Sequence, residues 1–126
     1  MHSSAENESQ ATGDPTAHAE LILLRRASAT LSRTELARMT LYAAAEPCAM
    51  CAAAIVWSGV GRLVYGLSAT AVRAEDPLPP GMPEPGVQGR ALLEATLNGP
   101  AIIGPALEMD ARNALFPDRQ KPPTKR

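Results

Sequence analysis

The residues with the clearest capacity for chemistry are Cys48 and Cys51, the two cysteines of the chain. Their C-x-x-C spacing, at the start of a predicted helix, places both sulfur atoms on one helix face. The partial positive charge at a helix N-terminus favours the thiolate form of such residues. A pair of this kind can bind a metal, form a redox disulfide or serve a structural purpose, and the spacing alone leaves these alternatives open.

The presence of His18 makes a metal site the favoured interpretation of the two cysteines. One histidine and two cysteines make three protein ligands, the number typical of a catalytic zinc with an open fourth position, whereas a structural zinc normally has four. The chain has no third cysteine, and its other histidine, His2, lies next to the N-terminus. A single histidine near a helix start is more often a surface or capping residue, so the predicted zinc site depends on all three residues together.

The sequence around these residues forms a longer motif. Glu20 completes H-A-E with His18, and residues 46–51 read E-P-C-A-M-C, which together match the signature of zinc deaminases. The chain also reads D-P-T-A-H-A-E at 14–20, L-Y-A-A-A-E-P-C-A-M-C-A-A-A-I at 41–55 and G-R-L-V-Y-G at 61–66. These segments resemble the cytidine deaminase-like superfamily of CMP/dCMP-type zinc deaminases, in the branch that contains guanine deaminase and tRNA adenosine deaminase. The resemblance is close over residues 7–67 and loose over residues 90–116.

This resemblance implies a zinc hydrolase that removes an amino group from a nucleobase or nucleoside. In such enzymes a zinc-bound hydroxide attacks the amine-bearing ring carbon, and ammonia leaves. Glu20 would carry the proton from water to the substrate as general base and acid. The resemblance also implies contacts to the base by the backbone N–H of Ala19 and by Asn7. The alternative for Asn7 is a turn residue in a polar leader, and Glu46 is expected to cap the helix that follows it.

The sequence is compatible with three functions. The segment Trp57-Ser58-Gly59 resembles the deaminases of free bases, which favours a guanine- or cytosine-type substrate. The first alternative is a tRNA adenosine-to-inosine deaminase. The second is a catalytically impaired zinc-binding dimerisation module, because members of the superfamily begin with a helix and two strands that are expected to be missing here.

Alternating helical and strand patterns predict an α/β fold with a partly parallel sheet. The resemblance specifies the three-layer α/β/α cytidine deaminase-like sheet, N-terminally truncated. The predicted organisation is an irregular leader at 1–13, a zinc-dependent deaminase domain at 14–116 with a proline-rich loop at 74–89, and a basic disordered tail at 117–126. Residues 31–38 fit either a helical extension or a loop. The predicted elements are helices from Asp14 to about residue 30 and at 46–58, 89–98 and 107–115, with strands at 40–45, 62–67 and 100–104.

Composition narrows the function classes. With 126 residues, 45% of them hydrophobic, the chain suits one globular domain. A net charge of −1 argues against a protein that coats nucleic acid, and no apolar run approaches the ~18 residues of a membrane span. We therefore expect a cytoplasmic protein that acts on a small molecule, with tRNA as the alternative partner, and the resemblance adds a homodimer. Aromatic residues are scarce, and Trp57 is expected in the core, with a position near a dimer face as the alternative.

Overall fold

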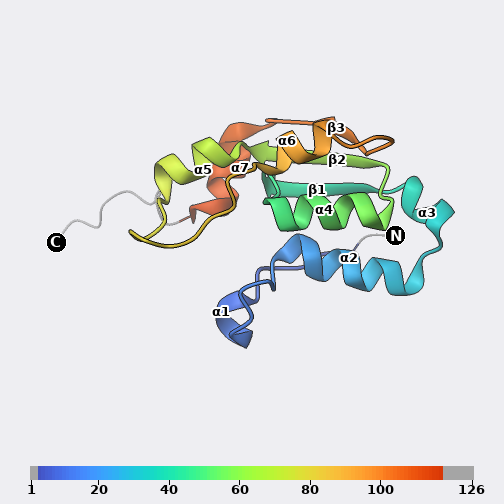
Figure 1. Cartoon of the computed structure of the whole chain (residues 1–126), viewed down its shortest axis with the longest axis horizontal. Helices are drawn as coiled ribbons and strands as arrows, with labels where there is room; N and C mark the ends of the chain where they lie inside the picture. Colours follow the sequence, from blue (N-terminus) through green and yellow to red (C-terminus); the bar gives the residue numbers. More distant parts are fainter. Residues whose placement is uncertain (1–2, 118–126) are drawn as a thin grey trace.

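The computed structural model describes residues 3–117, which form short helices around a small sheet (Figure 1). Its elements in chain order are α1 (Ser9–Thr12), α2 (Ala19–Thr30), α3 (Arg33–Ala37), β1 (Thr40–Ala45), α4 (Ala49–Ser58), β2 (Arg62–Leu67), α5 (Ala69–Glu75), α6 (Gly89–Glu94), β3 (Ala101–Ile103) and α7 (Glu108–Leu115). The two strands predicted at 40–45 and 62–67 are confirmed at those bounds. Within the described residues, no helix is both long and apolar enough to cross a membrane.

The strands form one parallel sheet in the order β1-β2-β3. Leu41 of β1 pairs with Leu63 of β2, which in turn pairs with Ile102 of β3. Because all three strands run in the same direction, their carboxyl ends lie at one edge of the sheet, where ligands of parallel α/β proteins commonly bind. The segments that follow β1 and β2, which begin with Glu46 and Ser68, therefore meet at that edge.

Side chains of the strands alternate between two faces of the sheet. The core on one face contains buried side chains of α2, α3, the strands, α4 and α6, namely Leu24, Leu36, Leu41, Ala52, Ile55, Val60, Leu63, Tyr65 and Leu93. The opposite face is covered by α7, whose Ala111 lies so close to Gly66 that a Cβ there would come within 2.1 Å of the alanine Cβ. Helices on both faces of a parallel sheet confirm the predicted three-layer α/β/α fold.

The N-terminal part differs from the prediction. Residues 9–12, expected to be irregular, form the helical turn α1. The predicted helix start at Asp14 is wrong, because α2 begins at Ala19 with His18 as its N-cap residue. The Asp14 carboxylate instead accepts hydrogen bonds from Thr16 N at 2.9 Å and from Thr16 Oγ1 at 2.7 Å. This local turn replaces the first helical turn, a competition typical of aspartate.

Several other boundaries shift. The open stretch at 31–38 contains the separate helix α3, which begins with a capping box between Ser32 and Glu35. The helix predicted from residue 46 begins at Ala49, and α5 falls where no helix is predicted. The predicted basic tail lies, beyond Pro117, outside the described residues.

Candidate metal centre

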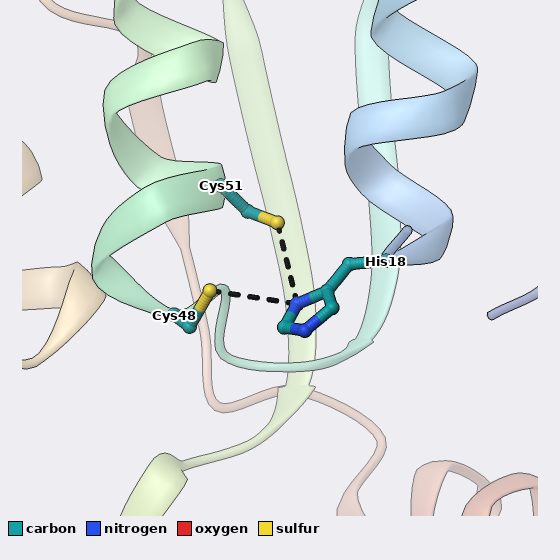
Figure 2. Close-up of side chains that lie close together, drawn as sticks. All are labelled: His18, Cys48 and Cys51. Carbon is teal, nitrogen blue, oxygen red and sulfur yellow. Dashed lines mark hydrogen bonds between the residues drawn. The ribbon is translucent and has the colours of Figure 1, made fainter. Parts of the chain in front are cut away.

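The three predicted metal ligands meet at the carboxyl edge of the sheet. Cys48 follows the end of β1 and is the N-cap residue of α4, and Cys51 lies in the first turn of that helix. His18 is the N-cap residue of α2, which packs against α4. Figure 2 shows the imidazole directed at both sulfur atoms. Two helix N-termini thus converge on the cluster, and their partial positive charges favour thiolate ligands.

The spacing of the donor atoms fits a zinc ion. His18 Nδ1 lies 3.5 Å from Cys48 Sγ and 3.7 Å from Cys51 Sγ, and all three donor atoms lie within 4.8 Å of one another. Tetrahedral zinc, with bonds of about 2.0–2.3 Å, would hold a nitrogen and a sulfur roughly 3.6 Å apart and two sulfurs roughly 3.8 Å apart. One imidazole nitrogen and two sulfurs are also a donor set that zinc accepts. The residues present therefore fit the metal that the sequence predicts.

The pKa values of the two thiols are shifted in opposite directions. Hydrogen bonding with Cys51 lowers the pKa of Cys48 to about 5 against the opposing effect of burial. The same hydrogen bond, together with burial and the negative charge of Glu20, raises the pKa of Cys51. Metal binding requires both sulfurs as thiolates, so binding to this pair would be accompanied by proton release.

The other predicted site residues differ in how near they lie to this cluster. Glu20 is half-buried in the first turn of α2, two residues after His18, and its negative charge helps to raise the pKa of Cys51. The N–H of Ala19 is at the start of α2, where helix N–H groups have no intrahelical acceptor. Asn7 is exposed, and its Oδ1 accepts hydrogen bonds from Ser9 N at 2.9 Å and Ser9 Oγ at 2.6 Å. These bonds are those of a turn residue, the alternative that the sequence leaves open for Asn7.

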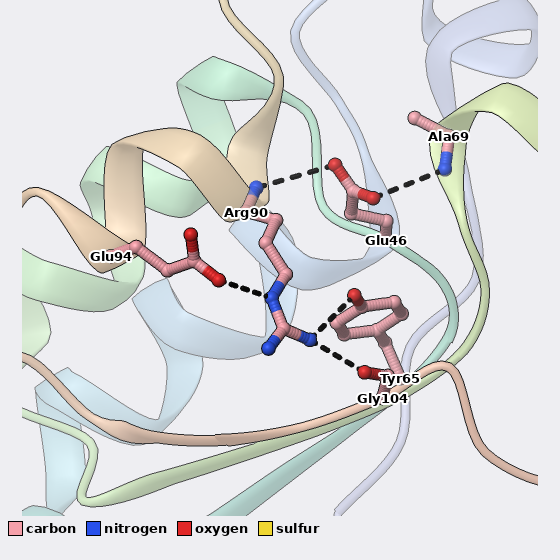
Figure 3. A network of polar contacts seen from close by, with 6 residues as sticks. All are labelled: Glu46, Tyr65, Ala69, Arg90, Glu94 and Gly104. Atoms are coloured by element: carbon pink, nitrogen blue, oxygen red, sulfur yellow. Dashed lines mark hydrogen bonds and ion pairs between the residues drawn. The ribbon is translucent and has the colours of Figure 1, made fainter.

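Glu46 has a role that differs from the predicted helix cap. Its buried carboxylate accepts hydrogen bonds from Ala69 N and from Arg90 N, both at 3.2 Å (Figure 3). It therefore bridges the first residues of α5 and α6 and does not cap α4. Arg90 in turn donates to Tyr65 Oη at 2.9 Å and to Gly104 O, and its guanidinium lies 5.8 Å from the Tyr65 ring centroid. This network fixes the segment that leads into Cys48.

Gly89 packs against the loop between β1 and α4, residues 46–48, which we call the metal loop. A Cβ at this position would come within 1.7 Å of the carbonyl oxygen of Pro47 and within 3.3 Å of the carbonyl oxygen of Cys48. No side chain larger than hydrogen fits between α6 and the metal loop. The start of α6 thus lies in direct contact with the backbone that presents Cys48.

Two features could not be read from local sequence patterns. The partners of Glu46 lie 23 and 44 residues along the chain, so no spacing rule connects them to it. The prediction that Trp57 lies in the core is wrong, because its side chain on α4 is 85% exposed. The face of α4 that meets the sheet carries Ala52 and Ile55 instead.

Comparison with known proteins adds a family and relatives. Residues 2–75 match the family model of the MafB19-like deaminases. A tRNA-specific adenosine deaminase of Haemophilus influenzae is 48% identical over 62 residues, which cover 49% of this chain and 36% of that protein. A probable cytosine deaminase of Schizosaccharomyces pombe is 35% identical over 99 residues, or 79% of this chain and 60% of the relative.

Solved structures agree with this grouping. The structure of a guanine deaminase from Nitrosomonas europaea superimposes with a TM-score of 0.69 at 30% identity, over 90% of this chain and 62% of that one. A further crystal structure, solved in complex with 8-azaguanine, gives a TM-score of 0.68 at 31% identity over 88% of this chain and 61% of its own. The present chain therefore spans 36% to 62% of the length of these relatives.

The metal ligands can be tested by substitution. We expect one zinc per chain in the native protein, and His18→Ala or Cys51→Ser should weaken zinc binding by more than the ~10–100-fold typical of lost outer partners. His2→Ala, which changes the other histidine, is the matched control and should retain the metal. Zinc content after dialysis and the thiolate-to-cobalt charge-transfer absorption of the cobalt-loaded protein measure the outcome. Full zinc content in His18→Ala would contradict the assigned ligand set.

The bridge made by Glu46 predicts a stability effect. In Glu46→Gln the side-chain oxygen can accept only from one of the two backbone N–H groups, so a buried donor is left unsatisfied. The free energy of unfolding should fall by about 1–3 kcal/mol. Glu94→Gln, which removes the exposed ion-pair partner of Arg90, should cost less than about 1 kcal/mol. Urea unfolding of the two metal-loaded variants compares them, and equal losses would show that the bridge is not stabilising.

Proposed function

The chain belongs to the MafB19-like deaminase family, and from this membership we propose that it is a zinc-dependent hydrolytic deaminase of a nucleobase or nucleoside. The observation that carries the proposal is the convergence of the donor atoms of His18, Cys48 and Cys51, with Glu20 two residues after His18 in the first turn of α2. Residues 14–116 are the proposed deaminase domain. The relatives are longer than this chain, so its activity is inferred from the site and not from their names.

The roles of the residues follow from hydrolytic deamination. Zinc held by His18, Cys48 and Cys51 would supply Lewis acidity, which lowers the pKa of water toward ~7. Glu20 accepts the proton of the attacking water and passes it to a ring nitrogen of the substrate. Glu20 then delivers the second water proton to the departing amino group. Water and the amino-substituted ring thus become a ring carbonyl and ammonia.

Binding groups for the base lie near the start of α2 and before it. We assign a substrate hydrogen bond to the N–H of Ala19, because N–H groups at a helix start point outward without intrahelical partners. We assign a second to the amide nitrogen of Asn7, whose oxygen is already bonded to Ser9. A planar base held by such donors would present its amino-bearing carbon to the metal site.

A guanine- or cytosine-type substrate is the proposed class. It is supported by the likeness to a probable cytosine deaminase over 79% of this chain and to a guanine deaminase structure over 90% of it. A tRNA adenosine deaminase is the second candidate, which the 48% identity to the Haemophilus influenzae relative over the motif region favours. A zinc-binding module without turnover is the third outcome that the experiment below distinguishes.

The proposal extends to location and assembly. Two reduced thiols are needed as ligands, and cytoplasmic redox conditions keep thiols reduced, so we place the protein in the cytoplasm. We also propose a homodimer, because exposed large apolar side chains such as Tyr42, Trp57 and Leu97 provide surface that a second copy could cover. Light scattering on the zinc-loaded chain measures its mass.

Removal of the proposed proton carrier tests the mechanism. Glu20→Gln should retain one zinc per chain and release ammonia at least about 100-fold more slowly, because general acid–base catalysis contributes roughly 10²–10⁴-fold. Glu108→Gln, an exposed glutamate at the start of α7, is the control and should keep the parent rate.

The substrate panel contains guanine, cytosine, adenine, their nucleosides and an anticodon stem-loop. Ammonia release from a free base or nucleoside supports the proposed class, and release from the stem-loop alone supports the second candidate. A zinc-loaded parent protein that releases no ammonia from any member would overturn the proposed enzyme activity. Equal rates for Glu20→Gln and the parent would overturn the assigned role of Glu20.

A further inference from the structure

A cavity of about 380 Å³ adjoins the metal loop on the side of Cys48. One wall is the connection from β1 to α4, residues 45–49, and a second wall is α5. The third wall is the end of the proline-rich segment, residues 84–89. This volume suits a small planar ligand, and Cys48 is the candidate metal ligand among the lining residues.

The charged residues of the cavity wall already have partners within the protein. Arg73 is the cationic residue among the lining residues, and Glu46 and Glu84 are the anionic ones, which gives the wall a formal charge of −1. Glu46 is committed to the two backbone N–H groups described above. Arg73 Nε is held by Glu84 Oε1 at 3.1 Å, and Arg73 Nη1 lies 3.5 Å from Asp76 O. An anionic ligand would therefore meet a net negative wall whose cation is already paired.

A second contact links the same two walls. Gln88 Nε2 lies 3.4 Å from Thr70 Oγ1, one turn of α5 before Arg73. The proline-rich segment is thus joined to α5 at two points, Glu84 and Gln88. Prolines at 77, 79, 80, 83 and 85 restrict the backbone of this segment, so Glu84 is presented to Arg73 with little loss of chain entropy.

We propose that Glu84 determines the charge specificity of the cavity by pairing with Arg73, so that uncharged bases and nucleosides are accepted and 5′-phosphorylated ones are rejected. This inference rests on the proposed function, because it assigns the cavity beside Cys48 to the substrate of that site. Glu84 and Arg73 are specificity-determining residues, with no part in proton transfer.

The ion pair between Arg73 and Glu84 is better suited to selecting ligands than to stabilising the fold. Its side chains are 42% and 48% exposed, and exposed ion pairs add little to folding free energy. A guanidinium released from Glu84, however, offers a planar fork of N–H donors that matches a phosphate group. Loss of the Glu84 charge should therefore change ligand preference while the fold is retained.

The experiment compares Glu84→Gln with the parent, both in the Glu20→Gln background so that bound ligand is not consumed. Equilibrium dialysis of the zinc-loaded proteins measures Kd for guanosine, guanosine 5′-monophosphate, cytidine and cytidine 5′-monophosphate. Glu84→Gln should tighten binding of at least one monophosphate by about tenfold, the scale of one charge-assisted contact, and change nucleoside binding by less than about twofold. An unchanged ratio of monophosphate to nucleoside affinity overturns the proposal.

Two further variants test whether the freed Arg73 guanidinium causes the gain in monophosphate binding. Glu75→Gln breaks a similar arginine–glutamate pair, with Arg112, that does not line the cavity, and should leave the ratio unchanged. Arg73→Gln combined with Glu84→Gln should lose the gain, because no guanidinium is then available for phosphate. A gain in Glu75→Gln or in the double variant would overturn the role given to Arg73.

Activity assays distinguish failure of the proposed reaction from failure of the role given to Glu84 and Arg73. If the chain with Glu20 intact releases no ammonia but Glu84→Gln still gains monophosphate binding, the proposed reaction fails and the cavity assignment stands. If ammonia is released and the affinity ratio does not change, the reaction stands and the assignment to Glu84 and Arg73 fails.

Discussion

The buried carboxylate of Glu46 is the interaction on which the rest of the site depends. A charged group in this position is costly unless its oxygens are bonded, and it obtains both bonds from the backbone of Ala69 and Arg90. The carboxylate therefore holds the starts of α5 and α6 beside the end of β1. Cys48 follows two residues later, so the path of the backbone into the metal ligand is determined by contacts with residues far along the chain.

The site is built from parts of unequal rigidity. The metal ligands lie at the first residues of α2 and α4, helices that pack on each other and on the sheet through Leu24, Ala52 and Ile55. The outer wall of the adjoining cavity belongs instead to an irregular segment rich in proline. Such a division, with candidate metal ligands on regular elements and a cavity wall in a loop, is common in proteins whose catalytic groups lie on a rigid scaffold and whose specificity lies in loops.

Local patterns predicted the features whose causes are local. The strand at 62–67 has β-branched and aromatic residues in succession, and the grouping of His18, Cys48 and Cys51 was predicted from a short cysteine spacing and a three-residue motif. The helix start at Asp14 failed because its carboxylate bonds to Thr16 and closes a turn. The place of Trp57 and the bridge of Glu46 depend on which faces meet after folding. Those contacts are non-local, and no spacing in the sequence encodes them.

The close approach of Gly89 to the carbonyl oxygen of Pro47 has a consequence for how such a protein can diversify. Residue 89 is constrained by the metal loop, whereas Glu84 and Pro85 before it line the cavity and do not belong to the metal-binding group. Substitutions or changes of length within the segment can therefore alter which molecules enter, as long as its last residue stays a glycine. Under the proposed function, retention of the metal and the range of accepted ligands would then vary independently of each other.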